Sequence, residues 1–178
     1  MKKFLIVIAC LVAFLVLVIV GGGMMLPKDY ELSRSIMIDA KPKAVHEYVG
    51  NLKKWEEWTP WKAHDESIVV THGKKSTGAG ASQTWTSKDG NGELTFTKSD
   101  KDTGVAYDMA FVAGEDRLPS QGSVTYEEAG KKTRVTWSMK GEMNIPIAGG
   151  WWAMTMDAWV GPMFDEGLAN LKKKVEGK

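Results

Sequence analysis

The 178 residues of the chain, 43% hydrophobic and 25% charged, suffice for one domain of ordinary size plus a short appendage, and this composition excludes global disorder. The 23 lysines and arginines nearly balance the 22 aspartates and glutamates, and no basic run is interleaved with aromatic residues. Nucleic acid is therefore not expected as a partner. The single cysteine, Cys10, excludes an intramolecular disulfide and any metal site built from several cysteines.

The chain begins with an apolar segment. No residue from 4 to 26 is charged, and residues 4–20 are nearly all aliphatic. At about 1.5 Å per residue such a helix crosses a hydrocarbon layer of roughly 30 Å. Lys2 and Lys3 precede it, which favours a cytoplasmic N-terminus. We therefore expect residues 1–26 to be a single-pass anchor that, in a bacterium, lies in the inner (cytoplasmic) membrane and holds the domain in the periplasm or otherwise outside the cytoplasm.

Two other interpretations of this segment stay open. A cleaved signal peptide has a similar charged start, but its apolar region is usually about 7–15 residues long, shorter than this one. Residues 7–10 (VIAC) resemble the small-residue-then-cysteine pattern of bacterial lipoproteins, although residues 11–20 continue apolar where a lipoprotein normally turns polar. The orientation rule is weakened by the basic residues that follow the span, although they belong largely to a folded domain: Lys28, Arg34, Lys41 and Lys43.

After a linker at residues 27–29, the chain alternates well enough over residues 30–39 to predict a first strand. Pro42 then stands in the first turn of a short helix that Gly50 can end. Trp55 and Trp58 share one face of a second short helix, which Pro60 stops. The three tryptophans within residues 55–61 are either a satellite core that pins this segment to the sheet, or the rim of a ligand opening or a surface touching lipid headgroups.

The middle of the chain is strand and turn. Alternating segments predict strands at residues 67–72, 81–88, 93–98, 104–112, 123–128 and 133–140, with a hairpin turn at residues 89–92. In the strand from Gly104, one set of side chains faces the core while Asp108 points away from it. With the first strand, these segments predict one continuous antiparallel sheet of six to seven strands.

The last segment, residues 149–178, has apolar residues at three- and four-residue steps, which predict one amphipathic helix. Gly161-Pro162 should kink this helix or start its second half. We expect the second half to pack on the sheet and the first half to face a ligand. The predicted fold class is α+β, a curved antiparallel sheet wrapped over a long C-terminal helix.

This order of elements resembles the helix-grip fold of the START-like, Bet v 1-like (SRPBCC) superfamily, and more specifically the membrane-anchored bacterial proteins called polyketide cyclase/dehydrase-like. The resemblance covers almost the whole chain, so that residues 30–178 form the START-like domain. The residues that carry it are RSI at 34–36, Ala40 with Pro42 and Val45, WEEWTPW at 55–61, GAS at 80–82 with Trp85, VTW at 135–137, and GPMFDEGLANLK at 161–172.

The resemblance implies a cavity between the long helix and the concave face of the sheet. Core packing explains each inward residue better when it is taken singly, but together the residues indicate an apolar pocket. The expected lining residues are Trp85, Leu94, Phe96, Tyr107, Met109, Phe111, Tyr126, Trp137 and Met139 from the strands, and Trp152, Met156, Trp159 and Met163 from the helix.

Catalytic constellations are mostly missing from the sequence. His46, His64 and His72 have no metal-ligand spacing and are expected at the surface. No inward strand position supplies a carboxylate or histidine as a base, so we assign no catalytic residue, no metal and no cofactor, and lean away from an enzyme.

The sequence thus predicts a membrane-tethered binding module for an apolar small molecule or a lipid. One alternative is a polyketide cyclase or dehydratase that uses Tyr107, Tyr126 or a pocket water as proton carrier. Another is a protein-interaction or stress-related module whose tryptophan segment meets a partner. The sequence specifies neither the ligand nor the oligomeric state.

Overall fold

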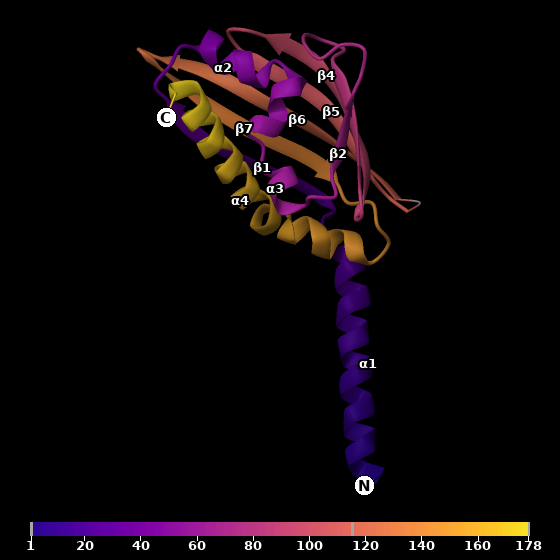
Figure 1. Cartoon of the computed structure of the whole chain (residues 1–178). Helices are drawn as coiled ribbons and strands as arrows, with labels where there is room; N and C mark the ends of the chain where they lie inside the picture. The colour runs from indigo at the N-terminus through magenta and orange to yellow at the C-terminus, as the bar shows by residue number, and fades with distance from the viewer. Residues whose placement is uncertain (1, 115, 178) are drawn as a thin grey trace.

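The computed structural model describes residues 2–114 and 116–177 as one curved sheet with helices against it and one helix projecting away (Figure 1). The elements, in chain order, are α1 (Lys2–Met25), β1 (Asp29–Ile38), α2 (Pro42–Val49), the 3-10 helix η1 (Leu52–Glu57), α3 (Trp61–His64), β2 (Val69–His72), β3 (Ser82–Ser87), β4 (Gly90–Asp100), β5 (Gly104–Ala113), β6 (Asp116–Ala129), β7 (Lys132–Glu142) and α4 (Ala148–Glu176).

All strand pairs are antiparallel, in the order β1-β7-β6-β5-β4-β3-β2. Only the pair β1–β7 joins strands that are distant in the sequence. The helices α2, α3 and α4 lie on one side of the sheet, and α4 packs chiefly over β1 (Figure 1). The predicted α+β fold, a seven-stranded antiparallel sheet covered by a long C-terminal helix, is confirmed.

Two strands begin earlier than the sequence predicts, and each contains a glycine in the added part. β4 already begins at Gly90, inside the predicted turn, and β6 begins at Asp116, well before residue 123. Gly92 stands directly opposite Trp85, and Gly122 directly opposite Tyr107. In both pairs the aromatic ring lies over the glycine, where a Cβ atom would otherwise sit. These glycines belong to strand interiors because each one makes room for a ring on the neighbouring strand.

The core is built around Trp137 of β7. Its ring stacks on Phe164 of α4 at a centroid distance of 3.9 Å and an interplanar angle of 5°, and Trp58 meets it edge-on at 5.1 Å. Trp55 and Trp58 are almost completely buried, while Trp61 is half-buried against Trp137 and Phe164. The tryptophan segment is therefore part of the core, as one of the two interpretations predicts.

The helix α4 stays continuous through Pro162. Its first half runs along the lower edge of the domain and its second half turns up across the sheet (Figure 1). At the turn, Gly161 lies against the guanidinium of Arg34, which pairs with Asp157 at 2.8 Å and with Asp165 at 3.2 Å. Arg34 thus fixes both halves of α4 to β1, one on each side of Pro162.

The helix α1 is long and apolar enough to span a membrane. It projects from the domain, and its C-terminal end contacts the start of α4 (Figure 1). The indole Nε1 of Trp151 donates a hydrogen bond to the backbone oxygen of Ile19 at 3.1 Å. Gly22 and Gly23 face Trp151 and Ile147 at this contact, where a side chain on either glycine would collide with α4.

We expect Phe164→Ala to lower the free energy of unfolding by about 3–5 kcal/mol, because it removes the ring stacked on Trp137 and leaves a cavity that the rigid aromatic cluster cannot close. Denaturant unfolding of the full chain in detergent measures this. Met154→Ala, at an exposed position on the same helix, should change the value little. Equal losses for the two variants would contradict the central place of the Trp137–Phe164 stack.

Candidate functional site

A cavity of about 500 Å³ lies between the concave face of the sheet, the segment around α3 and the first half of α4. The volume suits a drug-sized or short lipid-like molecule, since ligand pockets span about 300–1,000 Å³. Its wall is mostly apolar and rich in aromatic and methionine side chains. The apolar lining residues are Tyr30, Trp55, Trp61, Ile68, Val70, Trp85, Leu94, Tyr107, Met109, Phe111, Leu118, Trp137, Met139, Met143, Met156, Val160, Met163 and Phe164.

Most of the residues that the sequence nominates come together around this cavity. They arrive from β3, β4, β5, β7 and α4, and alternation along the strands places them on the inner face. These residues are Trp85, Leu94, Tyr107, Met109, Phe111, Trp137, Met139, Met156 and Met163. Whether they bind a ligand stays a prediction.

The structure places four other nominated residues elsewhere. Phe96 and Tyr126 do face inward, but Phe96 packs under Trp55 at 5.6 Å between centroids and Tyr126 lies against His46 of α2, so the short helices fill the space above them. Trp152 and Trp159 point outward, with 56% and 69% of their surface exposed. The inner face of α4 is taken instead by Ala153, Met156 and Val160.

Several lining residues were not nominated from the sequence. Tyr30 and Leu32 lie two residues apart on β1 and are both buried, so the inward direction of Tyr30 could have been predicted from the strand pattern. Its ring lies over Gly141 of the neighbouring strand, and its hydroxyl is 2.7 Å from the hydroxyl of Ser120. Ile68 falls in the predicted strand 67–72, where it alternates in step with Val70, although β2 itself begins at Val69. Met143 lies outside the regular elements, where no periodicity could have indicated it.

The polar groups of the cavity are mostly satisfied by the protein itself. The Tyr107 hydroxyl accepts a hydrogen bond from Trp137 Nε1 at 2.9 Å, and burial raises the pKa of Tyr107 to about 12. Lys62 and Glu56 pair with each other at 3.0 Å. The exception is Gln83, whose buried Oε1 has no hydrogen-bond partner in the described chain.

Tyr107 and Asp65, two titratable groups of the cavity wall, are poorly suited to abstract a proton. A phenol with a pKa near 12 stays protonated at neutral pH, so Tyr107 can donate a hydrogen bond but cannot act as a base. Hydrogen bonds from Ser67 hold the pKa of Asp65 below its ordinary value, the opposite of what a general base needs. Within residues 2–114 and 116–177, no group of three or more His, Cys, Asp or Glu side chains could hold a metal.

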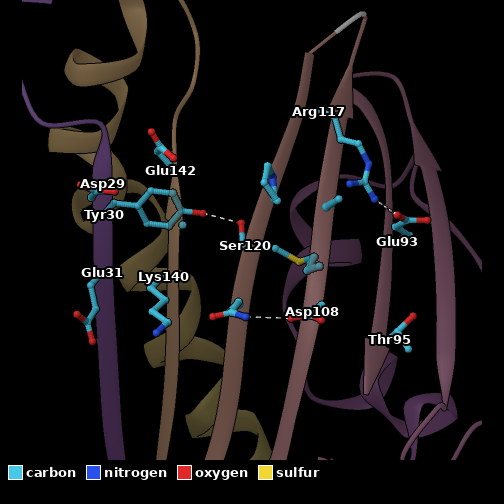
Figure 2. A pocket seen from close by; sticks show the side chains of 15 residues that line it. Asp29, Tyr30, Glu31, Glu93, Thr95, Asp108, Arg117, Ser120, Lys140 and Glu142 are labelled. Carbon is cyan, nitrogen blue, oxygen red and sulfur yellow. Dashed lines mark hydrogen bonds and ion pairs between the residues drawn. The ribbon is translucent and has the colours of Figure 1, made fainter. Parts of the chain in front are cut away.

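A second hollow, of about 960 Å³, lies on the outer face of the sheet (Figure 2). Two pairs of its polar side chains interact (Figure 2): Arg117 pairs with Glu93, and Gln121 donates to Asp108 at 3.3 Å. As predicted, Asp108 is exposed. Since most of its polar side chains are exposed and two pairs of them bridge strands, we interpret this hollow as an ordinary outer sheet surface rather than a ligand site.

The expectation of a surface position is wrong for His46. Its Nδ1 lies 3.2 Å from the Tyr126 hydroxyl and its Nε2 lies 3.3 Å from the Ser99 hydroxyl, so the imidazole joins α2 to β6 and β4. Burial lowers the pKa of His46 and raises that of Tyr126. Gly50 is needed here, because a side chain at that position would collide with the imidazole ring. The contact between His46 and Tyr126 therefore links α2 to the sheet outside the cavity.

The curved sheet, the long helix and the apolar cavity between them define a helix-grip protein of the START-like, Bet v 1-like type. The model of the family described as polyketide cyclase / dehydrase and lipid transport matches residues 30–176. The chain belongs to this family, and the resemblance found in the sequence is confirmed. A search of the curated proteins gives no match.

Solved structures share the fold at low identity. The hypothetical protein jhp0584 from Helicobacter pylori has a TM-score of 0.61 at 10% identity, covering 82% of this chain and 87% of that one. Protein TTHA0849 from Thermus thermophilus has 0.57 at 21% identity, covering 83% and 97%. Ara h 8.0201 has 0.55 at 11% identity, covering 84% and 99%. These likenesses show the fold alone.

We expect the free energy of unfolding to fall as the pH drops below about 6.5, the ordinary pKa of histidine, because the unfolded chain then takes up a proton that the buried His46 resists. His46→Gln removes this site, so its stability should fall less over the same acidic range. Denaturant unfolding of the full chain in detergent at a series of pH values measures both curves. They should run parallel above about pH 7; parallel curves below it as well would contradict the assignment.

Proposed function

We propose that this protein is a membrane-tethered binding module that holds an apolar small molecule or a lipid in the cavity between α4 and the sheet. The observation that carries the proposal is the cavity itself, a space of about 500 Å³ that is walled by aromatic and methionine side chains and lies beside the buried apolar core. Burial of apolar ligand surface would supply most of the affinity. Methionines such as Met109, Met156 and Met163 adapt their shape to irregular ligands.

A single polar group would orient the ligand. The Oε1 atom of Gln83 is buried in the cavity wall with no partner among the described residues, and an unpaired buried acceptor costs free energy that a ligand donor recovers. We therefore propose that the bound molecule carries one hydroxyl or amide N–H at the end that lies by β3. The remainder of the molecule would be hydrocarbon.

The helix α1 would hold the domain at a membrane. Lys2 and Lys3 favour a cytoplasmic N-terminus, so the domain would lie across the inner membrane from the cytoplasm. The contact between α1 and α4 supports a retained anchor over a cleaved signal peptide. Cleavage would remove the backbone oxygen that accepts the hydrogen bond from Trp151. It would also remove Gly22 and Gly23, which leave room for Trp151 and Ile147.

The cavity favours binding over the cyclase or dehydratase alternative. Of the proton carriers in that alternative, which are Tyr107, Tyr126 and a pocket water, Tyr107 is held protonated and so is no base, and Tyr126 lies outside the cavity. The tryptophan segment is also folded into the core, which leaves the protein-interaction alternative without the exposed surface on which it depends.

Filling the cavity should abolish binding. Met156→Trp places an indole in the space, because Met156 lines the cavity, whereas Met154→Trp makes the same change at a side chain that is 63% exposed. We expect the full chain and Met154→Trp to carry the same apolar molecule through purification in detergent, and Met156→Trp to carry much less of it. Mass spectrometry of the extracted molecules measures this. Equal amounts in all three proteins, or none in any of them, would contradict a ligand cavity.

Gln83→Leu should weaken binding of a long-chain alcohol by roughly 2–12-fold, the value of one neutral hydrogen bond, and leave an alkane of equal length bound as before. Displacement of a fluorescent apolar probe from the full chain measures both affinities. Gln121→Leu, on the outer face of the sheet, is the control. Equal weakening for alcohol and alkane would show that Gln83 supports the cavity only by packing.

A further inference from the structure

The first half of α4 carries an apolar face that the domain does not cover. Trp152, Met154 and Trp159 are 56%, 63% and 69% exposed. Ile147 and Trp151, at the start of the helix, are 42% and 38% exposed. Trp152 and Trp159, seven residues apart, share one side of the helix, and Trp151 and Met154 extend its exposed surface. Together with Ile147 at the N-cap, these residues are called the outer face of α4. Large aromatic side chains on the surface are costly in water, so such a cluster indicates a surface that meets something apolar.

The charge distribution agrees with an apolar partner. Between Met143 and Phe164 the only charged residue is Asp157. Its carboxylate pairs with Arg34 at 2.8 Å, on the side of the helix where α4 meets β1. Nothing charged therefore interrupts the outer face of α4, whereas the second half of the helix exposes Lys173 and Lys174.

The position of this face relative to α1 identifies what could cover it. Trp151 donates to the backbone oxygen of Ile19, so the start of α4 lies level with the last turns of the apolar helix. Figure 1 shows α1 running away from the domain just beside the start of α4, with the first half of α4 lying crosswise to it along the edge of the domain. A bilayer crossed by α1 would end at the height of this face.

We propose that the outer face of α4 docks on the bilayer that α1 enters, with Trp152 and Trp159 in the boundary between headgroups and acyl chains. Tryptophan prefers this zone, because its ring is apolar and its N–H reaches polar groups. The inference rests on the proposed tether and adds a second, peripheral contact to it. The inner side of the same half-helix lines the cavity through Met156 and Val160, so one helix separates the cavity from the membrane.

The test uses the full chain with Cys10→Ala, reconstituted in phosphatidylcholine and phosphatidylglycerol vesicles. An environment-sensitive fluorophore is attached at Trp159→Cys, or at Lys173→Cys as the matched control on the exposed second half of α4. Resistance to alkaline carbonate extraction reports separately whether α1 is inserted. Quenching by lipids with a nitroxide near the headgroup reports whether each labelled position touches the bilayer.

We expect both proteins to resist extraction, with blue-shifted and strongly quenched emission at position 159 and neither effect at 173. Adding Trp152→Ser and Met154→Ser should reduce the quenching at 159 without releasing α1. Insertion with equal, weak quenching at both positions overturns the docking and leaves the tether intact. Release of the protein by carbonate overturns the tether, and the docking with it. Shielding at 159 without lipid quenching, together with crosslinking between two chains, assigns this face to a second copy and also overturns the proposal.

Discussion

The arrangement of the helices on the sheet depends on the packing of one indole, that of Trp137. It stacks on Phe164 of α4, meets Trp58 of the segment after α2, and donates its N–H to Tyr107 on β5. Gly167 leaves room for it, since a Cβ atom there would lie 2.8 Å from the ring. One side chain thereby joins the long helix, the short helices and the sheet. The cavity is the space that remains on the side of this cluster facing the first half of α4.

The floor of that cavity follows from a second constraint, the pairing of aromatic residues with glycines across strands. Trp85 faces Gly92, Tyr107 faces Gly122 and Tyr30 faces Gly141, each in direct register. With no side chain beneath it, each ring can lie along the sheet instead of standing up from it. Large residues thus line the wall of the cavity without filling it, which reconciles a tryptophan-rich interior with an open space.

These two constraints explain how far the sequence could predict the structure. Strand alternation identified Tyr107, Met109 and Phe111 as inward residues, because a period of two leaves only two faces. It failed at Gly92 and Gly122, whose role depends on a ring that another strand supplies. In α4, the sequence predicts that Trp152 and Trp159 face inward, but both are exposed. Apolar residues surround the first half of the helix, so its periodicity does not distinguish inside from outside. The link between His46 and Tyr126 joins residues 80 positions apart, and no local pattern contains it.

The pairing of β1 with β7 also sets an order of events during synthesis. β1 follows α1 directly, but its hydrogen-bonding partner is complete only at Glu142, and α4 follows later still. Such long-range pairing forms slowly, and a chain is made from its N-terminus at about 5–20 residues per second. The apolar helix therefore emerges before the strand beside it can pair. Under the proposed tether, attachment to the membrane precedes closure of the sheet, and the cavity, which needs both the closed sheet and α4, forms last.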